Sequence, residues 1–343
     1  MDRSGAPGIA LDSTSTVREH PLHPLMKTNL LRTTLAILCL AGFAASTSSA
    51  AVIMEYVTVA SGIFGNSNDS RTGYDYGAVA YSYQIGKYDV TNEQYAEFLN
   101  AVDPTGGNAL ELYNSNMLIG FNLGAAVGSR YSVSASTARK PVQWVSIFDA
   151  TRFANWLNNG QGSGDTETGA YTLSLGGAAG RNEGATVFLP SEDEWYKAAY
   201  YNPTTLAYYE YGTGSNAVPS ASAPTASPNS ANYNNAAAGV TDVGAYTGSA
   251  SYYGAFDMAG NVFQWTDDNF GSNYRVARGG WYAYNDASGM SSSFRNPIAP
   301  LSYEYLSVGF RVASIVPEPT SAVSLILSLG VLAARRYRKR TVC

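Results

Sequence analysis

Apolar residues recur at helical spacing in a stretch near the start of the chain's central region, DVTNEQYAEFLNAV at 89–102. The apolar positions fall at i, i+3, i+4 and i+7, which is typical of a helix buried on one face; they are Tyr95, Phe98, Leu99 and Val102. Thr91 stands ahead of this run and Gln94 follows three residues later. This spacing predicts a helix that begins with a capping box.

Two further stretches have the same character. VSIFDATRFANWLN at 145–158 places Asp149 three residues after Ser146, and LPSEDEWYKAAYY at 189–201 places Glu194 three residues after Ser191. Both pairs predict an N-cap with its reciprocal partner. Pro203 is expected to end the last helix because proline cannot continue the hydrogen-bond ladder.

Short alternating or β-branched runs predict strands between and after these helices. They are VTVASG near residue 57, YSYQIGKYDV from 81, RVARGG at 275–280 and GFRVASI from 309. Long irregular tracts separate them, and 214–239, rich in Ser, Ala, Pro and Asn, predicts a polar surface loop. The pattern favours a single α+β domain with short helices, short strands and long loops.

Both ends of the chain have the composition of processing signals. Residues 26–50 combine a basic start, an apolar run and a small-residue exit, which predicts a signal peptide; a buried helix is the alternative. Residues 1–25 are then an upstream extension without expected structure, and Met26 competes with Met1 as the start.

The last residues, 316–343, contain VPEP, a run of fourteen apolar-leaning residues and the basic RRYRKR. The run is short for a membrane span, which needs about 20 residues. The segment resembles the PEP-CTERM sorting signal of Gram-negative bacteria, which implies cleavage by an exosortase-type membrane protease. A plain C-terminal anchor is the alternative, and both place residues 51–315 outside the inner membrane, in the cell envelope or extracellular matrix.

Charge and residue usage exclude several functions for residues 51–316. This segment holds 12 Lys and Arg against 22 Asp and Glu, a formal charge of −10, and nucleic-acid binding needs the opposite sign. The chain's cysteines and histidines all lie outside it, at Cys39, Cys343, His20 and His23. Zinc sites, histidine-based iron sites and Ser-His-Asp triads are therefore not expected there.

Six collinear blocks of the sequence resemble the formylglycine-generating enzyme family, also called the sulfatase-modifying factor domain. The blocks are YQIGKYDVTNEQYAEFLN, PVQWVSIFDATRFANWL, FLPSEDEWYKAA, YGAFDMAGNVFQWTDD, VARGGWY and VGFRVA. They span nearly all of 51–315. The resemblance implies the family fold, a variant of the C-type lectin architecture.

Catalytic members of that family carry two copper-binding cysteines after the Arg-Gly-Gly turn. Aligned on this chain, those positions hold Tyr284 and Gly289. Copper(I) prefers thiolate ligands, which neither residue supplies. The resemblance therefore implies a scaffold without its oxidase chemistry, and no copper, iron or zinc is expected.

A calcium site of the family falls on DMAGNVFQW. The resemblance assigns its ligands to Asp257, the carbonyls of Gly260 and Val262, and Gln264, where the family has glutamate. Oxygen ligands in an irregular loop suit this cation, while Asp257 capping a turn and Gln264 bonding to backbone are the alternative. A second family calcium site near residues 231–233 is too altered to carry over.

The segment after the Gly-Gly turn lines the active-site groove in the family. It supplies aromatic and polar candidates for ligand contact, a combination typical of binding surfaces: Trp281, Tyr284, Asn285, Asp286, Arg295 and Asn296. The sequence thus favours an exported, non-catalytic module that binds a glycan, peptide or matrix component. Its partners would be the export machinery and the tail-processing protease.

Two other functions stay open. One is an enzyme of this family using carboxylate or tyrosine chemistry, with Asp267 and Asp268 or residues 192–194 as candidates. Those acids also fit a solvated strand end and a helix first turn. The other function is that of a purely structural matrix protein.

Overall fold

The computed structural model describes residues 51–61, 66–73, 75–174, 177–178, 180–271, 273–298 and 300–317. All of them belong to one compact unit of the chain, Ser48–Cys343. The predicted extension at 1–25, the signal peptide at 26–50 and the tail beyond residue 317 lie outside the described residues. So do Cys39, Cys343, His20 and His23.

Three α-helices form where the capping signals predict them. They are α1 (Asn92–Val102), α2 (Ile147–Asn158) and α3 (Glu192–Tyr200), and each begins with the expected reciprocal capping box. Two short 3₁₀ helices are η1 (Ser70–Thr72) and η2 (Ala287–Met290). Local side-chain hydrogen bonds satisfy the first free amide groups, so these helix starts are fixed by sequence alone.

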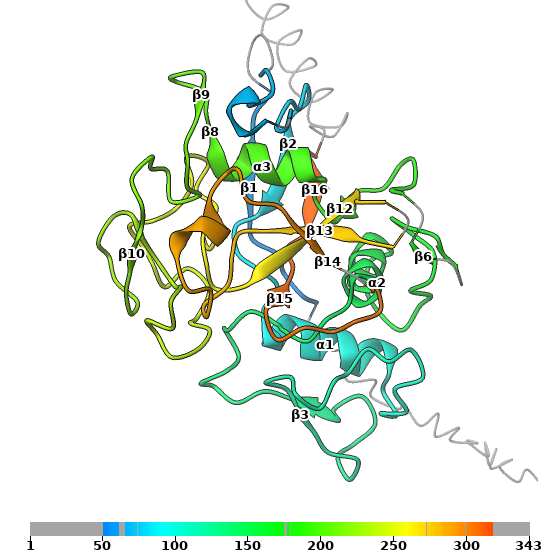
Figure 1. The fold of residues 1–343 in the computed structure, drawn as a ribbon. Coiled ribbons are helices and arrows are strands. Elements are labelled where there is room, and N and C mark those ends of the chain that lie inside the picture. Colours follow the sequence, from blue (N-terminus) through cyan, green and yellow to red (C-terminus); the bar gives the residue numbers. More distant parts are fainter. Residues whose placement is uncertain are drawn as a thin grey trace, which may run out of the picture. The chain divides into compact units, whose positions relative to one another are not determined.

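The first sheet has four strands in the order β1-β2-β16-β7, all antiparallel; Figure 1 labels β1, β2 and β16 of this sheet. The strands are β1 (Tyr56–Val59), β2 (Tyr83–Gly86), β16 (Ala313–Ile315) and β7 (Val187–Phe188). Alternate residues of β2 face inward, and Tyr83 and Ile85 are fully buried. The sheet therefore joins the first and last strands of the described chain around β2.

The second sheet has the order β14-β13-β12-β15 and carries the segments of interest. Its strands are β12 (Phe263–Asn269), β13 (Arg275–Arg278), β14 (Asn296–Ile298) and β15 (Val308–Gly309). β12 pairs antiparallel with β13 and parallel with β15. In Figure 1, α3 lies beside this sheet, and its Trp195 is fully buried.

Four two-stranded pairs occupy the connecting segments. They are β3 (Gly120–Phe121) with β4 (Tyr131–Ser132), β5 (Leu173–Ser174) with β6 (Gly177–Ala178), β8 (Tyr201–Asn202) with β9 (Ala207–Tyr208), and β10 (Ser220–Ala221) with β11 (Ser230–Ala231). The prediction of a surface loop for 214–239 is wrong at Ser230–Tyr233, which is buried. Asn232 bridges to Gly260 there, so this stretch is anchored to the segment before β12.

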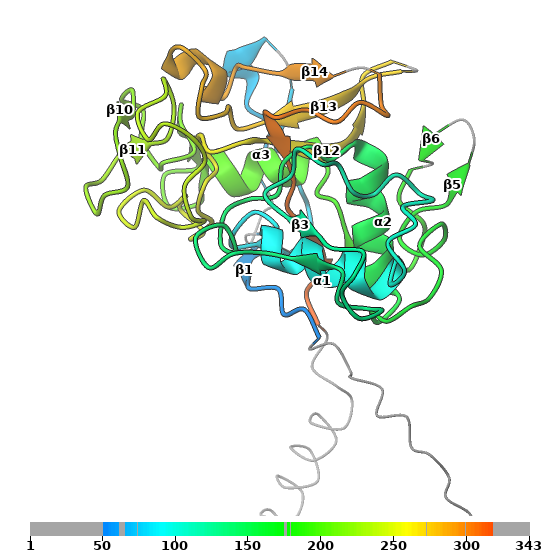
Figure 2. The same ribbon diagram turned by 90° about the horizontal axis from the view of Figure 1, so that it is seen from below.

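Aromatic rings fill the space between α1, α2 and the segment leading to β16. Figure 2 shows the two helices side by side. Phe153 lies 5.4 Å from Phe98 and 5.3 Å from Phe310, centroid to centroid, both edge-on. Such ring pairs add specific geometry to the burial of apolar area. Many of the chain's aromatic residues thus pack in its interior. The three α-helices and many short strands agree with the predicted α+β class.

Candidate functional site

The turn after β13 brings the candidate segment back over the sheet. Gly279 and Gly280 have φ values of +103° and +76°, a conformation that favours glycine. A Cβ on Gly280 would lie 2.5 Å from Met290 Cγ and 3.2 Å from the Gly289 carbonyl oxygen. Any other residue at 280 would push η2 away, so the turn sets the position of the residues that follow.

Tyr284 and Gly289 lie directly against each other. A Cβ added to Gly289 would stand 2.8 Å from Cδ1 and 2.9 Å from Cγ of the Tyr284 ring. That ring is held edge-on by Phe263 at 6.0 Å and by Phe294 at 5.4 Å. Tyr284 and Gly289, the positions that the resemblance aligns with cysteines, are therefore in contact, and the Tyr284 ring covers Gly289.

The polar residues after Tyr284 are exposed. Asn285 lies on the surface, and Asp286, also exposed, caps η2 by accepting a hydrogen bond from the Ser288 amide (2.8 Å). Hydrogen bonding by Ser288 lowers the pKa of Asp286, which stays ionised. Trp281 is half-buried and packs edge-on against Tyr282 at 5.0 Å. The structure thus brings Trp281, Asn285 and Asp286 to the surface near the Tyr284 ring.

Arg295 faces inward toward a carboxylate that sequence reasoning did not pair with it. Its Nε donates to both oxygens of Glu192 (2.9 Å each), and its Nη2 lies 2.5 Å from Oε2. Arg278 binds the same carboxylate through Nε (2.8 Å) and Nη2 (2.5 Å). Asn296 opens β14 opposite Ala277. The charged group of Arg295 is therefore engaged within the protein.

The acids considered for carboxylate chemistry meet at one place, the start of α3. Asp268 accepts a hydrogen bond from the Glu192 amide, and Glu194 pairs with Arg181 (2.7 Å) while completing the capping box. Asp267 lies 3.4 Å from Arg181, and burial raises its pKa to about 6. Asp267 and Asp268 do lie near the end of β12, as the structural interpretation expects, but they are half-buried and contact the helix start instead of being solvated.

The candidate calcium residues form a hydrogen-bonded network with Arg311. The Gln264 carbonyl oxygen accepts from Trp195 Nε1 and from Arg311 Nε, both at 2.6 Å. Its amide nitrogen donates to the Asp257 carbonyl (2.7 Å). Asp257 Oδ2 accepts from the Gly244 amide (2.7 Å), and burial raises the pKa of Asp257 to about 6.

Gly260 and Val262 continue this segment toward β12. The Gly260 amide donates to the Gly279 carbonyl (2.7 Å), and Val262 is fully buried. A cation placed at the four positions would meet the Arg311 guanidinium and compete for a Gln264 oxygen that already has two donors. Among the described residues, no group of three or more His, Cys, Asp or Glu is placed to hold a metal ion. The hydrogen bonds of Gln264 are those that the alternative interpretation expects, and calcium binding at these positions stays a prediction.

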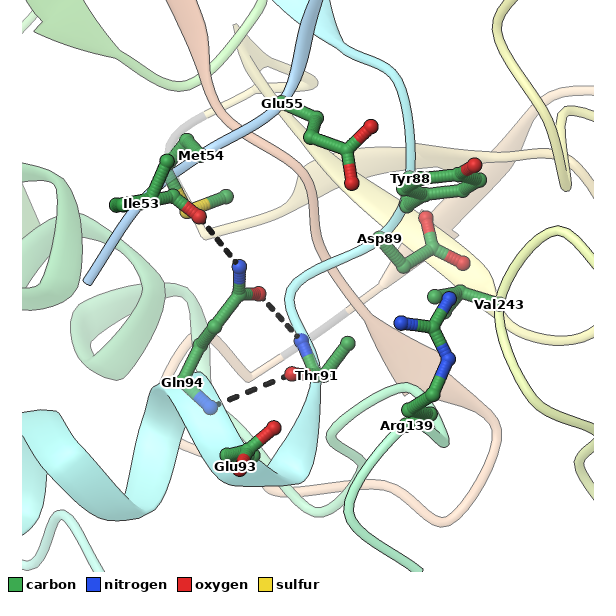
Figure 3. A pocket seen from close by; sticks show the side chains of 10 residues that line it. All are labelled: Ile53, Met54, Glu55, Tyr88, Asp89, Thr91, Glu93, Gln94, Arg139 and Val243. Atoms are coloured by element: carbon green, nitrogen blue, oxygen red, sulfur yellow. Dashed lines mark hydrogen bonds between the residues drawn. The ribbon is translucent and has the colours of Figure 1, made fainter.

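Two cavities lie at residues that the sequence did not indicate. One, of about 1020 Å³, is lined mainly by residues 66–71 and 201–208. The other, of about 190 Å³, lies between the segment before β1 and the start of α1 and includes Asp89 and Arg139 (Figure 3). No periodicity or motif marks Arg139, and Asp89 belongs to a strand signal, so only the fold could bring them together.

The sequence of residues 43–316 matches the family of the sulfatase-modifying factor enzyme 1-like domain. The chain belongs to this family. The recognition of the formylglycine-generating scaffold is thereby confirmed, while the C-type-lectin-like detail and the PEP-CTERM signal stay predictions.

Curated relatives of this family member include hercynine oxygenases. The enzyme of Mycobacterium tuberculosis is 26% identical over 251 residues, covering 63% of this chain and 48% of the relative. That of Mycolicibacterium smegmatis is 26% identical over 266 residues, covering 68% and 53%. The chain thus spans about half the length of these relatives.

Solved structures similar to this family member include the Treponema denticola variable protein 1, with 19% identity and a TM-score of 0.49 over 78% of this chain and 98% of that one. CarF has 20% identity and a TM-score of 0.49, covering 77% and 99%. Within the part of the chain that the structure covers, no helix combines the length and apolarity that a membrane crossing requires.

Proposed function

We propose that residues 51–315 form an exported, non-catalytic ligand-binding module on the sulfatase-modifying factor scaffold. It acts at the cell envelope or in the exopolymer matrix and recognises a glycan, a peptide or a matrix component. The contact surface is formed by Trp281, the edge of Tyr284, Asn285 and Asp286. Aromatic faces beside exposed amide and carboxylate groups suit such ligands, because they combine contact area with directional hydrogen bonds.

The packing of the Tyr284 ring on Gly289 is the observation that carries this proposal. The resemblance implies copper thiolates at the corresponding positions of catalytic relatives, whereas here one position is a phenol packed edge-on against Phe263 and Phe294 and the other has no side chain. Neither the donor chemistry nor the space fits copper. This supports a scaffold that serves recognition without the copper chemistry.

An enzyme with other chemistry is the second candidate, because the relatives at 26% identity are hercynine oxygenases. The residues it would use are the carboxylates around Glu192 and Asp267. Those carboxylates form ion pairs with arginines and lie at the start of α3, which supports a structural role for them. The match covers about half of each relative. The hercynine oxygenases therefore contain further residues that have no counterpart in this match.

A peptide-oxidation assay tests whether the chain retains the family's copper chemistry. The purified body, residues 51–315, incubated with a Cys-x-Pro-x-Arg peptide, copper and oxygen should yield no formylglycine by mass spectrometry. Substantial conversion would refute the non-catalytic proposal.

Ligand recognition is tested on glycan and peptide arrays, with and without calcium. The exposed variant Asn285→Arg should lose binding at least tenfold, while Asn116→Arg, an equally exposed asparagine in another loop, should bind as the wild type does. Equal binding by both variants would contradict the assigned surface and favour the purely structural role. A calcium-dependent signal would support the predicted ion site.

Export is a separate part of the proposal, supported by the composition of residues 26–50 and 316–343. The export machinery and an exosortase-type protease would be its partners, with transient anchoring in the inner membrane through the tail. Mass spectrometry of the secreted protein should find both ends removed. A product that retains residues 1–50 and 316–343 would contradict this.

A further inference from the structure

A small cavity lies at the junction of four chain segments, away from the Tyr284 surface. Its walls come from the segment before β1 (Ile53–Glu55), the loop between β2 and α1 (Tyr88–Thr91), the first turn of α1, and two single residues, Arg139 and Val243. Gln94 fixes two of these walls, since its amide donates to the Ile53 carbonyl (3.1 Å) and accepts from the Thr91 amide (3.0 Å) (Figure 3). At about 190 Å³ the cavity exceeds the space of a single water.

Asp89 contributes a buried acceptor that the protein leaves without a hydrogen bond. The residue is 1% exposed, and its Oδ1 accepts from Arg311 Nη2 (2.9 Å). Its Oδ2 has no hydrogen-bond partner among the described residues. An unsatisfied buried acceptor costs about 1–3 kcal/mol. Figure 3 shows this carboxylate on the cavity wall, turned toward Arg139.

Burial is the main cause that raises the pKa of Asp89, to about 8, and Arg311 opposes it. A second cation close to Oδ2 would therefore help to keep the carboxylate ionised at neutral pH. Glu55, another lining residue, is already paired with Lys87 (3.4 Å), so Asp89 Oδ2 is the buried carboxylate oxygen that the described residues leave without a partner here. This side of the cavity is suited to an ammonium group.

Arg139 supplies the opposite charge. Within the described structure its guanidinium forms no hydrogen bond or ion pair, whereas Arg278, Arg295 and Arg311 all bind carboxylates. A planar guanidinium with free N–H groups is the preferred partner of a carboxylate. The cavity thus presents an unpaired donor group and an unpaired acceptor facing each other, with Met54, Tyr88 and Val243 as less polar neighbours.

We propose that this cavity binds the zwitterionic group of a free α-amino acid, with its carboxylate on Arg139 and its ammonium on Asp89 Oδ2. The carboxylate and ammonium of an amino acid stand on one carbon, so a single small ligand satisfies both unpaired protein groups. The site goes beyond the proposed recognition surface and shares no residue with it. Failure of one proposal leaves the other intact.

The test is calorimetric titration of the full body with L-methionine or L-leucine, alongside the N-acetylated and the carboxamide forms of the same compounds. Wild-type protein should bind the free amino acid, and each blocked form should bind at least tenfold more weakly. Absence of saturable binding up to about 10 mM would overturn the proposal and assign the cavity to water.

Two variants locate the binding. Arg139→Gln should weaken it at least tenfold with an unchanged melting temperature, because Arg139 is exposed and its guanidinium is unpaired. Arg71→Gln, at an exposed arginine that lines the larger cavity and pairs with Asp69, is the control for loss of a positive charge and should bind as the wild type does. Wild-type affinity in Arg139→Gln, or equal loss in both variants, would contradict this site.

Discussion

Gly289 and the Tyr284 ring form one packing unit at the start of the loop that follows β13. The backbone of Gly289 does not require glycine, since its φ lies outside the left-handed region. What requires glycine is the ring, because it occupies the space that a Cβ would fill. Two residues five positions apart thus constrain each other through volume.

A double-mutant cycle measures this constraint. Gly289→Ala should lower the free energy of unfolding by about 1–3 kcal/mol, because the new methyl group would clash with the Tyr284 ring, which packs against Phe263 and Phe294. In the background of Tyr284→Ala the same change should cost almost nothing. Urea unfolding of the four proteins gives the coupling energy, and additive effects would show that the ring and Gly289 do not contact.

At the scale of elements, Glu192 ties α3 to the second sheet. Its carboxylate is 3% exposed and is shared by Arg278 at the end of β13 and Arg295 just before β14. Arg278 also donates to the carbonyls of Ser292 (2.9 Å) and Phe294 (2.6 Å). One buried acid therefore positions the helix, a strand and the loop between β13 and β14.

Removing either arginine should have unequal effects. Arg278→Met should destabilise by about 3–5 kcal/mol, since it strips a buried ion pair and leaves carbonyls unpaired. Arg295→Met should cost less than half of that, because its side chain is 18% exposed and water can replace it. Thermal unfolding of both variants checks the order, and equal losses would argue against the central role of Arg278.

The elements differ in how far the sequence could predict them. Helix starts at Thr91, Ser146 and Ser191 follow from contacts three residues apart, so local sequence suffices. The strand from 309 was predicted too long, because Phe310 and Arg311 lie outside β15 and β16 and turn into the interior. The missed strand β12 is mostly buried on both faces and lacks a clear alternation.

The candidate site was only partly predictable, because some of its contacts are local in sequence and others join distant residues. Surface residues such as Asn285 and Asp286 follow a local turn, and their exposure could be anticipated. Arg295 could not be placed, because its partner Glu192 is 103 residues away and no pattern links the two. The position of Asp89 and Arg139 on one cavity likewise depends on tertiary structure.

At the scale of the whole molecule, buried acids make stability depend on pH. Burial raises the pKa of Asp149 to about 7, against hydrogen bonds from Ser146 that lower it. The folded state then holds this proton more tightly than the unfolded chain does. Its contribution to stability is complete below about pH 4 and is lost as pH rises through 7.

Asp149→Asn removes this titration. Relative to wild type, the variant should gain on the order of 2 kcal/mol in unfolding free energy between about pH 4.5 and pH 7.5. Asp165→Asn is the control, because a hydrogen bond from Thr168 lowers the pKa of that exposed acid and its titration falls below this window. Urea titrations at both pH values check the sign, and a gain in both variants would contradict the assignment.

The position of β2 between β1 and β16 has a consequence for biosynthesis. The central strand of the first sheet acquires one neighbour from residues 56–59 and the other from residues 313–315. During translation β2 therefore keeps an open hydrogen-bonding edge until almost the last described residue has left the ribosome. In nascent chains of any shorter length, that edge stays open to pairing with other polypeptides.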